Sequence, residues 1–500
     1  MKGCGIMLFL SRQMIKDAEM RAMEDVSAMH LIRNASLALF DAVKDFNSVR
    51  VYCGKGNNGS DGYATALLLK KSGKDVEIVK VMPPQSEDCK ALYEEALAAE
   101  IPILSCENYP SKSFDCVIDA IFGIGINGEI TDENAIKAIN MINSSDSYIV
   151  SCDIPSGMDC DTANECGVCV NADKTVTFTA PKKGMLSNSS VDLCGEIVIS
   201  DVGIAVDYTA ISQSTCVPIT GKLVKSMLPK RKRYSHKGTF GTSVIVAGSA
   251  LMPGACAMAA MAAQRSGVGI VKIIAPVSIC RILNILVKEA IVIPAPEKNG
   301  VLHPELCPLA LDAISTADSI LVGCGLSVGE HHLLLNNILN SSKCGVIIDA
   351  DALTSLSGKL DIIRNKDVLI TPHPKEFSRI SGYSTKEIEK SRIRLADNFA
   401  KENGIPILLK GARTVIAYGG TNKYVSLSST SALAKAGSGD VLAGIIVSLA
   451  AQGLSLTDSG AAACYIHSAA GTLAEKELTA YGVTADDLIN YIPYAFSQIN

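Results

Sequence analysis

The sequence lacks an excess of charge of either sign, and it lacks long apolar runs. It has 46 Lys and Arg against 51 Asp and Glu, a formal net charge of −5. So mild a balance argues against a polyanion-binding surface, and we expect no nucleic-acid partner. No apolar run reaches the roughly 18 residues of a membrane span, and the first residues lack the length and cleavage site of a signal peptide. We therefore expect a cytoplasmic protein without a membrane partner.

Charged residues make up only 19% of the chain and hydrophobic residues 48%. This composition excludes a disordered chain and provides sizeable cores. At 500 residues the chain exceeds one ordinary domain, and two large α/β units would fit. The 17 cysteines are odd in number and scattered, which is typical of free buried thiols in a reducing compartment. The pair Cys166 and Cys169 has metal-ligand spacing, but a single pair is weak evidence for a metal site.

The first half alternates between strand-like and helix-like segments. Residues 11–46 have the spacing of one or two amphipathic helices. A β-prone run at 49–53 then meets a glycine-rich loop at 54–62, and a helix is predicted over 63–71, which is the opening of a Rossmann-like unit. Further strands are predicted at 76–81, 114–118, 148–152, 174–179 and 196–199, with helices at 86–99 and 133–142. This alternation predicts a parallel sheet.

A second α/β series follows a boundary expected within residues 205–235. The basic run at 230–233 in that segment is interpreted as a solvated loop. Strands are predicted at 242–247, 270–275, 291–293, 319–322, 346–348, 368–370, 407–409 and 414–417, and helices at 255–266, 376–380, 392–403, 441–452 and 459–477. The expected fold class is α/β, with two three-layer αβα domains.

Three loops of the first half carry oxygen-rich side chains at predicted strand ends. They contain Asn57, Asn58 and Asp61, then Asp119, and then Asp153 with Ser156. Ligands of a parallel sheet bind outside the carboxyl ends of its strands, so these loops can converge on one site. Their carbonyl and carboxylate oxygens are hard ligands for a cation. The alternative is three ordinary turns that use Gly, Asp or Ser as caps.

The motifs GKGNNGSDG, DAIFGIG and DIPSGMD resemble the NAD(P)H-hydrate epimerase domain over about residues 11–205, and we place this domain at 1–210. The resemblance implies that Asp153 binds substrate and is the acid/base. It implies that potassium lies among Asn58, Asp119 and Ser156. It implies that the hydrated nucleotide contacts Asn57, Asn58, Gly59, Ser60, Asp61, Gly123, Ile124, Gly125, Ile126, Asn127, Gly128 and Glu129. Departures from the family pattern are Ser60, where Gly is usual, and the segment 32–36.

The strongest signal of the second half is the turn KAGSGD, which opens a long apolar helix. Free amides at its start and the helix dipole favour a phosphate, and Asp440 can act as a base on a hydroxyl held there. The alternative is an Asp N-cap with glycines for the turn. His373 lies between two prolines at a predicted strand end, which favours a functional role over a structural one. Lys410 and Arg413 offer cations to phosphates.

These pieces resemble the ADP-dependent NAD(P)H-hydrate dehydratase domain of the ribokinase-like fold over about residues 225–500. The motifs lie at 237–241, 248–255, 323–326, 373–376, 410–414 and 439–440. The resemblance implies substrate contacts at Ala255, Gly325, His373 and Asp440. It implies nucleotide contacts at Lys410, Gly411, Ala412, Arg413, Thr414 and Gly439, with Mg²⁺ bridging the phosphates. Cys324 stands where the family usually has Pro.

Together the two resemblances imply a bifunctional repair enzyme that epimerises the R and S forms of hydrated NADH and NADPH (NADHX and NADPHX). Its second activity is the dehydration of the S form at the expense of ADP. A homo-oligomer is expected. Two alternatives stay open. A ribokinase-type small-molecule kinase would use the same glycine–Asp turn, and the first half could be a binding or scaffolding module without catalysis.

Overall fold

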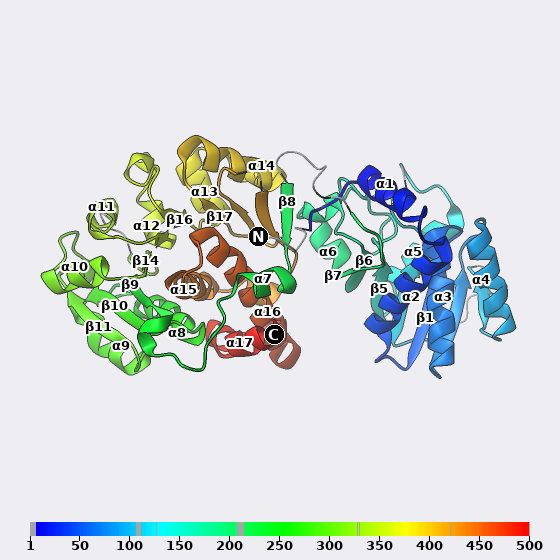
Figure 1. Ribbon diagram of the computed structural model, residues 1–500, viewed down its shortest axis with the longest axis horizontal. Coiled ribbons are helices and arrows are strands. Elements are labelled where there is room, and N and C mark those ends of the chain that lie inside the picture. The colour runs from blue at the N-terminus through cyan, green and yellow to red at the C-terminus, as the bar shows by residue number, and fades with distance from the viewer. Residues whose placement is uncertain are drawn as a thin grey trace. The chain divides into compact units, whose positions relative to one another are not determined.

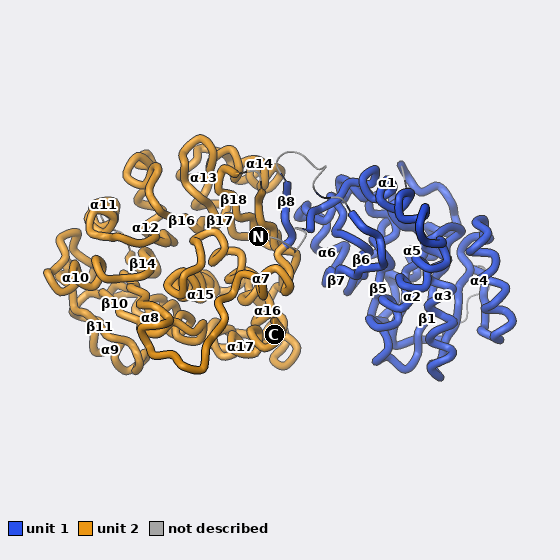
Figure 2. The backbone as a smooth tube through the Cα atoms, in the orientation of Figure 1, with its two compact units in different colours: residues 1–218 blue, residues 219–500 orange. Residues whose placement is uncertain are grey.

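The computed structural model describes residues 7–106, 112–126, 128–206, 208, 215–327, 329, 331–420 and 422–499. The chain forms two compact units, Met1–Pro218 and Ile219–Asn500 (Figure 2). The break between them lies inside the segment 205–235. No helix in the described ranges combines the length and the apolar character that a membrane crossing requires.

Unit 1 is built on a seven-stranded parallel sheet in the order β3-β2-β1-β4-β5-β6-β7 (Figure 1). Its strands are β1 (Ser48–Cys53), β2 (Asp75–Lys80), β3 (Ile103–Ser105), β4 (Cys116–Ala120), β5 (Tyr148–Cys152), β6 (Lys174–Phe178) and β7 (Glu196–Ser200). Its α-helices are α1 (Arg12–Ala22), α2 (Ala28–Val43), α3 (Asn57–Lys71), α4 (Glu87–Ala98), α5 (Glu133–Asn143) and α6 (Ser190–Cys194).

The strands of unit 1 are buried on both faces, because a parallel sheet takes helices on each side. Val49 and Val51 of β1 pack in one core cluster together with side chains of α2, α3 and α4. Tyr52, the residue after Val51, lies on the opposite face of the strand and packs in a second cluster with side chains of α5. The predicted three-layer α/β architecture is therefore confirmed for this unit.

Two features of unit 1 differ from the prediction. Helix α3 begins at Asn57, with Gly56 as its N-cap, so residues 57–62 of the segment expected as a loop form the first turns of the helix. The glycines hid the helix because their helix propensity is low. Strand β3 was not predicted, because it has only three residues at the edge of the sheet.

Unit 2 is built on a ten-stranded sheet in the order β11-β10-β9-β14-β15-β16-β17-β18-β19-β8, whose edge strand β8 spans the division at Pro218. The strands from β11 to β17 are parallel, and β17, β18 and β19 form an antiparallel meander. The strands are β8 (Thr215–Ile219), β9 (Thr242–Val246), β10 (Ile270–Pro276), β11 (Ile291–Ala295), β14 (Ser319–Val322), β15 (Val346–Ile348), β16 (Val368–Ile370), β17 (Ile407–Leu409), β18 (Val415–Ala417) and β19 (Asn422–Ser426). A separate hairpin pairs β12 (Glu297–Lys298) with β13 (Val301–Leu302).

Helices cover both faces of this sheet (Figure 1). They are α7 (Gly221–Met227), α8 (Pro253–Arg265), α9 (Cys280–Leu286), α10 (Pro308–Ser315), α11 (His331–Ser341), α12 (Ala350–Thr354), α13 (Pro374–Ser381), α14 (Thr385–Asn403), α15 (Ser438–Ala451), α16 (Leu456–Gly482) and α17 (Ala485–Ser497). The largest core cluster joins one face of the strands to α8, α15, α16 and α17. Helix α15 is buried along nearly its whole length, as its apolar sequence predicts.

The structure extends the predicted elements of unit 2. Helix α14 begins at Thr385 and not at 392, because a kink with non-helical dihedrals at Ser391 interrupts its pattern. Strand β8 and helix α7 lie in the segment that was interpreted as an irregular boundary. Strand β19 was missed because Asn422 and Lys423 interrupt its apolar pattern.

Candidate active sites

The glycine-rich start of α3 brings backbone segments of unit 1 into close contact. A Cβ atom built on Gly54 would lie 1.9 Å from the carbonyl oxygen of Ile121, and one on Gly59 would lie 2.1 Å from that of Gly54. Only glycine fits at these two positions. A Cβ on Gly123 would lie 3.2 Å from Oδ1 of Asn58. The loop after β4 therefore packs against the first turn of α3.

Asp119 is fully buried at the end of β4 and accepts several hydrogen bonds. The hydroxyl of Ser151 and the backbone N–H of Ser156 each donate to its Oδ2 at 2.8 Å, and the hydroxyl of Ser156 donates to its Oδ1. Burial raises the pKa of Asp119 in spite of these donors. Its carboxylate has no cationic side chain as a partner within the described part of the chain.

The three predicted potassium ligands gather around the same loop. Ser156 contacts Asp119 directly, and its hydroxyl accepts from the backbone N–H of Phe122 at 2.8 Å. Asn58 lies against Gly123, and its buried Nδ2 has no hydrogen-bond partner among the described residues. The three side chains supply carboxylate, amide and hydroxyl oxygens, which suits a hard monovalent or divalent cation.

Asp153 follows β5 in a strained backbone conformation with φ of 66°. Its Oδ1 accepts from the backbone N–H of Phe178 at 3.1 Å and from the hydroxyl of Thr177 at 3.4 Å. The ammonium of Lys182 forms a buried ion pair with the same oxygen. The sequence analysis did not identify Lys182. This residue follows the end of β6, and ligands of a parallel sheet bind at such strand ends, so the same argument could have identified it.

Two further carboxylates interact electrostatically with Asp153. Burial raises the pKa of Asp61 well above its usual range, and the charges of Asp153 and Glu19 raise it further. Burial likewise raises the pKa of Glu19, with Asp153 adding to the shift and Lys182 opposing it. Glu19 comes from α1, which carries no motif, so no sequence signal points to it.

Of the predicted substrate-binding loop 123–129 in unit 1, only part lies beside the other site residues. Gly123 itself lies against Asn58, as described above. The side chain of Glu129 packs against Gly167, where a Cβ would lie 3.1 Å from Glu129 Cγ. Asn127 lies outside the described residues.

In unit 2 the turn before α15 has the geometry of an anion-binding helix start. Gly437 is the N-cap in a left-handed conformation with φ of 87°, and no side chain in the described part of the chain caps the free amides that follow. Gly439 leaves room on this turn, since a Cβ there would lie 3.6 Å from the ammonium of Lys410. Backbone N–H groups and a lysine thus face the same space.

Asp440, in the first turn of α15, has a perturbed carboxyl group. Burial raises its pKa to about 6, and the charge of Asp349 adds to the shift. The thiol of Cys324 and the ammonium of Lys410 lower the pKa in part. A carboxyl group that titrates close to neutral pH suits a general base.

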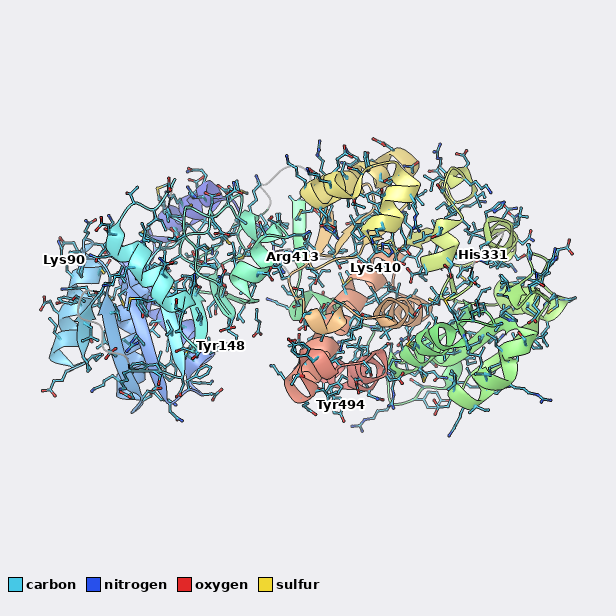
Figure 3. The ribbon with its side chains drawn as sticks, turned by 180° about the vertical axis from the view of Figure 1, so that it is seen from behind. Lys90, Tyr148, His331, Lys410, Arg413 and Tyr494 are labelled. Atoms are coloured by element: carbon cyan, nitrogen blue, oxygen red, sulfur yellow. The ribbon has the colours of Figure 1, made fainter. Side chains whose placement is uncertain are left out.

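Lys410, labelled in Figure 3, forms an ion pair with a carboxylate at the end of another strand of the same sheet. Its Nζ lies 2.7 Å from Oδ1 of Asp349, which also accepts from the hydroxyl of Thr371 at 2.8 Å. Lys410 begins the turn between β17 and β18, and the guanidinium of Arg392 donates to its carbonyl at 2.6 Å. Arg392 thereby supports this turn, a role that nothing in its helical sequence indicates.

His373 has a defined hydrogen-bonding state at the start of α13. Its Nδ1 accepts from the backbone N–H of Lys375 at 3.0 Å and of Glu376 at 3.3 Å, while Glu376 accepts from the backbone N–H of His373 at 2.8 Å. Burial lowers the pKa of His373, and the charge of Lys410 lowers it further. Both effects favour the neutral ring, and Nε2 carries its proton because Nδ1 accepts the two backbone bonds.

The other predicted substrate contacts of unit 2 lie beside this cluster. A Cβ on Gly325, where φ is 65°, would lie 2.8 Å from Cβ of Ala255. Cys324, the residue before Gly325, interacts with Asp440. Ala255, Gly325, Asp440 and the Asp349–Lys410 pair therefore come from different strand ends and meet at one edge of the sheet.

Two predicted nucleotide contacts have internal partners. Arg413 is 1% exposed, and its guanidinium donates to the carbonyl of Leu427 at 2.5 Å (Figure 3). The hydroxyl of Thr414 donates to the carbonyl of Gly411 at 2.8 Å and closes the turn that also holds Ala412. These bonds shape the turn, and only Lys410 of this segment has a side chain beside Gly439.

His467 is a further residue at this site, and the sequence analysis did not identify it. Its Nε2 lies 3.2 Å from the hydroxyl of Ser438 in the turn before Asp440. Burial lowers the pKa of His467 to about 4, so the ring is neutral at physiological pH. Its place in the long helix α16, far from any motif, gave no sequence signal.

Comparisons with known proteins identify the family. A family model described as NAD(P)H-hydrate dehydratase matches residues 243–494, and one described as YjeF-related protein N-terminus matches residues 28–184. A bifunctional NAD(P)H-hydrate repair enzyme of Moorella thermoacetica is 31% identical over 95% of this chain and 93% of its own length. The corresponding enzyme of Escherichia coli is 32% identical over 88% of this chain and 83% of its own length.

Solved structures include an ADP/ATP-dependent NAD(P)H-hydrate dehydratase from Bacillus subtilis. It is 29% identical and covers 56% of this chain and 98% of its own, with a TM-score of 0.48. The sequence relatives and the family model show that the chain belongs to the family of bifunctional NAD(P)H-hydrate repair enzymes. It is an enzyme of nicotinamide-cofactor repair, with an epimerase and a dehydratase function.

Proposed function

We propose that unit 1 interconverts the R and S forms of NADHX and NADPHX and that unit 2 dehydrates the S form. The epimerase domain corresponds to residues 1–210 and the dehydratase domain to 225–500. The observation that carries the proposal is the cluster in unit 2, where Asp440, Lys410 and the free amides after Gly437 lie together. A base, a cation and an anion-binding helix start are the groups that phosphoryl transfer to a hydroxyl needs.

The dehydration then proceeds in two steps. Asp440 accepts the proton of the hydroxyl on the hydrated ring while the oxygen takes the terminal phosphoryl group of the nucleotide. The ring nitrogen's lone pair next expels phosphate, and a proton leaves the neighbouring carbon to restore the ring's double bond. Phosphorylation is useful because hydroxide is a poor leaving group. The neutral ring of His373 offers its Nε2 proton to the substrate.

The nucleotide is ADP or ATP, and ADP is the donor we favour. Its phosphates would bind Lys410 and the amide of Gly439, beside the turn Gly411, Ala412, Arg413 and Thr414. Ala255 and Gly325 would line the position of the nicotinamide ring. Within the described residues no three acidic, His or Cys side chains are grouped to hold a metal, so Mg²⁺ would arrive with the phosphates, whose charge it neutralises.

In unit 1 the hydrated nucleotide would bind the first turn of α3, from Asn57 to Asp61, and the loop from Gly123 to Glu129. Asp153 is the acid/base. The donor set of Asn58, Asp119 and Ser156 fits potassium, because the buried carboxylate of Asp119 has no cationic side chain beside it in the described structure. Potassium bound there would supply fixed positive charge next to the substrate.

The decisive experiment supplies each separated epimer of NADHX to the purified chain with Mg²⁺ and either ADP or ATP. We expect reduced nicotinamide to reappear from both epimers, with the absorbance of the dihydropyridine ring as the measurement. Asp440→Ala should stop recovery from both epimers and leave their interconversion intact. Asp153→Ala should leave the R epimer unrepaired. Absence of recovery with either nucleotide would remove the dehydratase assignment.

A further inference from the structure

A buried ammonium is held by three acceptors beside the proposed acid/base of unit 1. Lys182 has a side chain that is 1% exposed, and its Nζ pairs with Oδ1 of Asp153. The same nitrogen donates to the carbonyls of Phe178 at 3.0 Å and of Ala180 at 3.3 Å. An ammonium has three N–H groups, so every one of them has a partner and the nitrogen is fixed in place.

The carboxylate of Asp153 is held through one oxygen. Oδ1 accepts from Lys182, from the backbone N–H of Phe178 and from the hydroxyl of Thr177. No described residue donates to Oδ2. A pair that served only stability would gain from a bond to each oxygen, whereas here one oxygen is saturated and the other is left for a ligand.

The backbone around this pair is also fixed. The N–H of Asp153 donates to the carbonyl of Val176 at 2.8 Å and holds the residue in its strained conformation. On the other side, Leu10 forms a parallel bridge with Lys182, with its N–H donating to the carbonyl of Pro181 at 2.9 Å. A strained residue that its surroundings hold this firmly is typical of a functional position.

We propose that Lys182 is a positioning residue for epimerisation, which binds Oδ1 of Asp153 and leaves Oδ2 as the oxygen that exchanges protons with the hydrated ring. The inference rests on the proposed role of Asp153. Lys182 also offsets negative charge around the site, since Glu19 and Asp61 both interact with Asp153. It does not touch the substrate and acts through the carboxylate.

The test uses the full chain with Lys182→Met, which keeps length and removes charge, and with Lys182→Arg, which keeps charge. Lys183→Met is the matched control, because Lys183 is the next residue and is exposed. Interconversion of the separated epimers is followed by chromatography without nucleotide. Dehydration of the S epimer by unit 2 and far-UV circular dichroism report whether the protein is folded.

We expect kcat for epimerisation to fall at least about 30-fold in Lys182→Met, with KM changed less than about threefold, since the base is misplaced and binding is not. The kcat of Lys182→Arg should lie between that of Lys182→Met and that of the wild type, and the kcat of Lys183→Met should equal that of the wild type. In an Asp153→Asn background, Lys182→Met should lower the remaining rate no further, because its effect passes through the carboxylate.

A folded Lys182→Met variant with wild-type kcat, or one that lowers the rate equally with and without Asp153, would overturn the inference. If Lys182→Met does not fold, Lys182→Arg decides: a lower kcat at unchanged KM supports the role, and a wild-type kcat rejects it. Failure of the wild-type chain to interconvert the epimers would reject the proposed function of unit 1, which is a separate outcome.

Discussion

At the scale of single residues, Asp440 shows a conflict between stability and chemistry. The protein buries its carboxyl group next to Asp349, which raises its pKa to about 6. An ionised carboxylate is therefore less favourable in the folded protein than in the unfolded chain, where its pKa is near the usual 3.8. The same burial gives a base that titrates near the pH at which it works.

The pH dependence of dehydration should report this group. Asp440 accepts a proton only when it is ionised, so kcat/KM should be constant above pH about 7 and fall tenfold per pH unit below about 6. Steady-state rates with the S epimer at saturating nucleotide would measure the profile. Epimerisation serves as the control because it does not use Asp440. If kcat/KM began to fall only below pH about 4, Asp440 would not be the base.

Replacing the base should stabilise the protein while it stops dehydration. Asp440→Asn removes a carboxylate whose ionisation is unfavourable in the folded state, so the free energy of unfolding at pH 7 should rise by up to about 3 kcal/mol. Because the folded pKa is raised, the wild type loses this stability as pH rises through the range from 3.8 to about 6. Urea unfolding at pH 7 and below pH 3.8 should show the difference at the higher pH only.

Lys410 should act on nucleotide binding. Lys410→Met removes the ammonium next to Gly439 and leaves Asp349 without its partner. We expect KM for ADP or ATP to rise roughly tenfold or more, as for loss of a charge-assisted contact. Lys375→Met is the matched control, since Lys375 is exposed near the same edge of the sheet. Equal KM values for the two variants would remove Lys410 from the nucleotide site.

The residues that the sequence could identify are those in strand-end motifs. Asp440, Lys410 and Asp153 all follow strands or open helices, and their chemistry suits the loops in which they lie. Lys182 also follows a strand, β6, so the same rule applies to it. His467 acquires its position only from packing, because helix α16 brings its ring to Ser438. No local pattern encodes that contact, so only the fold could reveal it.

At the scale of elements, the strands were easier to predict than the helix starts. Strand β5 was predicted with the observed bounds, because a buried parallel strand is a short apolar run between turn signals. Helix α3 was placed too late, because its first turn consists of residues that favour turns. The same feature makes that turn useful, since small side chains let ligands and backbone approach.

The two ends of α15 offer a matched test of the phosphate-binding turn. Gly437 and Gly453 both have positive φ, of 87° and 99°. A Cβ on Gly437 would meet Ala485 at 2.9 Å, whereas one on Gly453 meets nothing within 4 Å. Both Gly→Ala variants should lose about 1 kcal/mol through backbone strain, and Gly437→Ala should lose about 1–3 kcal/mol more through overpacking. Only Gly437→Ala should raise KM for the nucleotide, measured beside thermal unfolding.

At the scale of the whole molecule, the separation into two compact units explains how one chain carries two chemistries. Each unit has its own sheet and its own core, and each proposed site uses strand ends of a single sheet. The order of the two halves and their α/β class follow from the alternation of strands and helices in the sequence. The start of the second unit does not, because Pro218 and the nearby polar residues hide strand β8.

This difference leads to a prediction about where the second unit begins. A chain of residues 215–500 keeps β8 at the edge of the ten-stranded sheet, whereas one of residues 225–500 loses β8 and most of α7. The missing segment includes the buried side chains of Val217, Ile219 and Val224, so the shorter chain should be less stable by about 3 kcal/mol or more. Urea unfolding would measure the difference.

Dehydration supplies the control for that comparison. Both chains retain the turn at Gly437, Asp440 and the Asp349–Lys410 pair, so kcat on the S epimer should agree within about twofold wherever both are folded. A chain of residues 225–500 as stable as the longer one would show that β8 contributes little to unit 2. A selective loss of kcat would instead mean that the edge strand supports the site, because the meander from β17 to β19 connects that edge to the turn at Lys410.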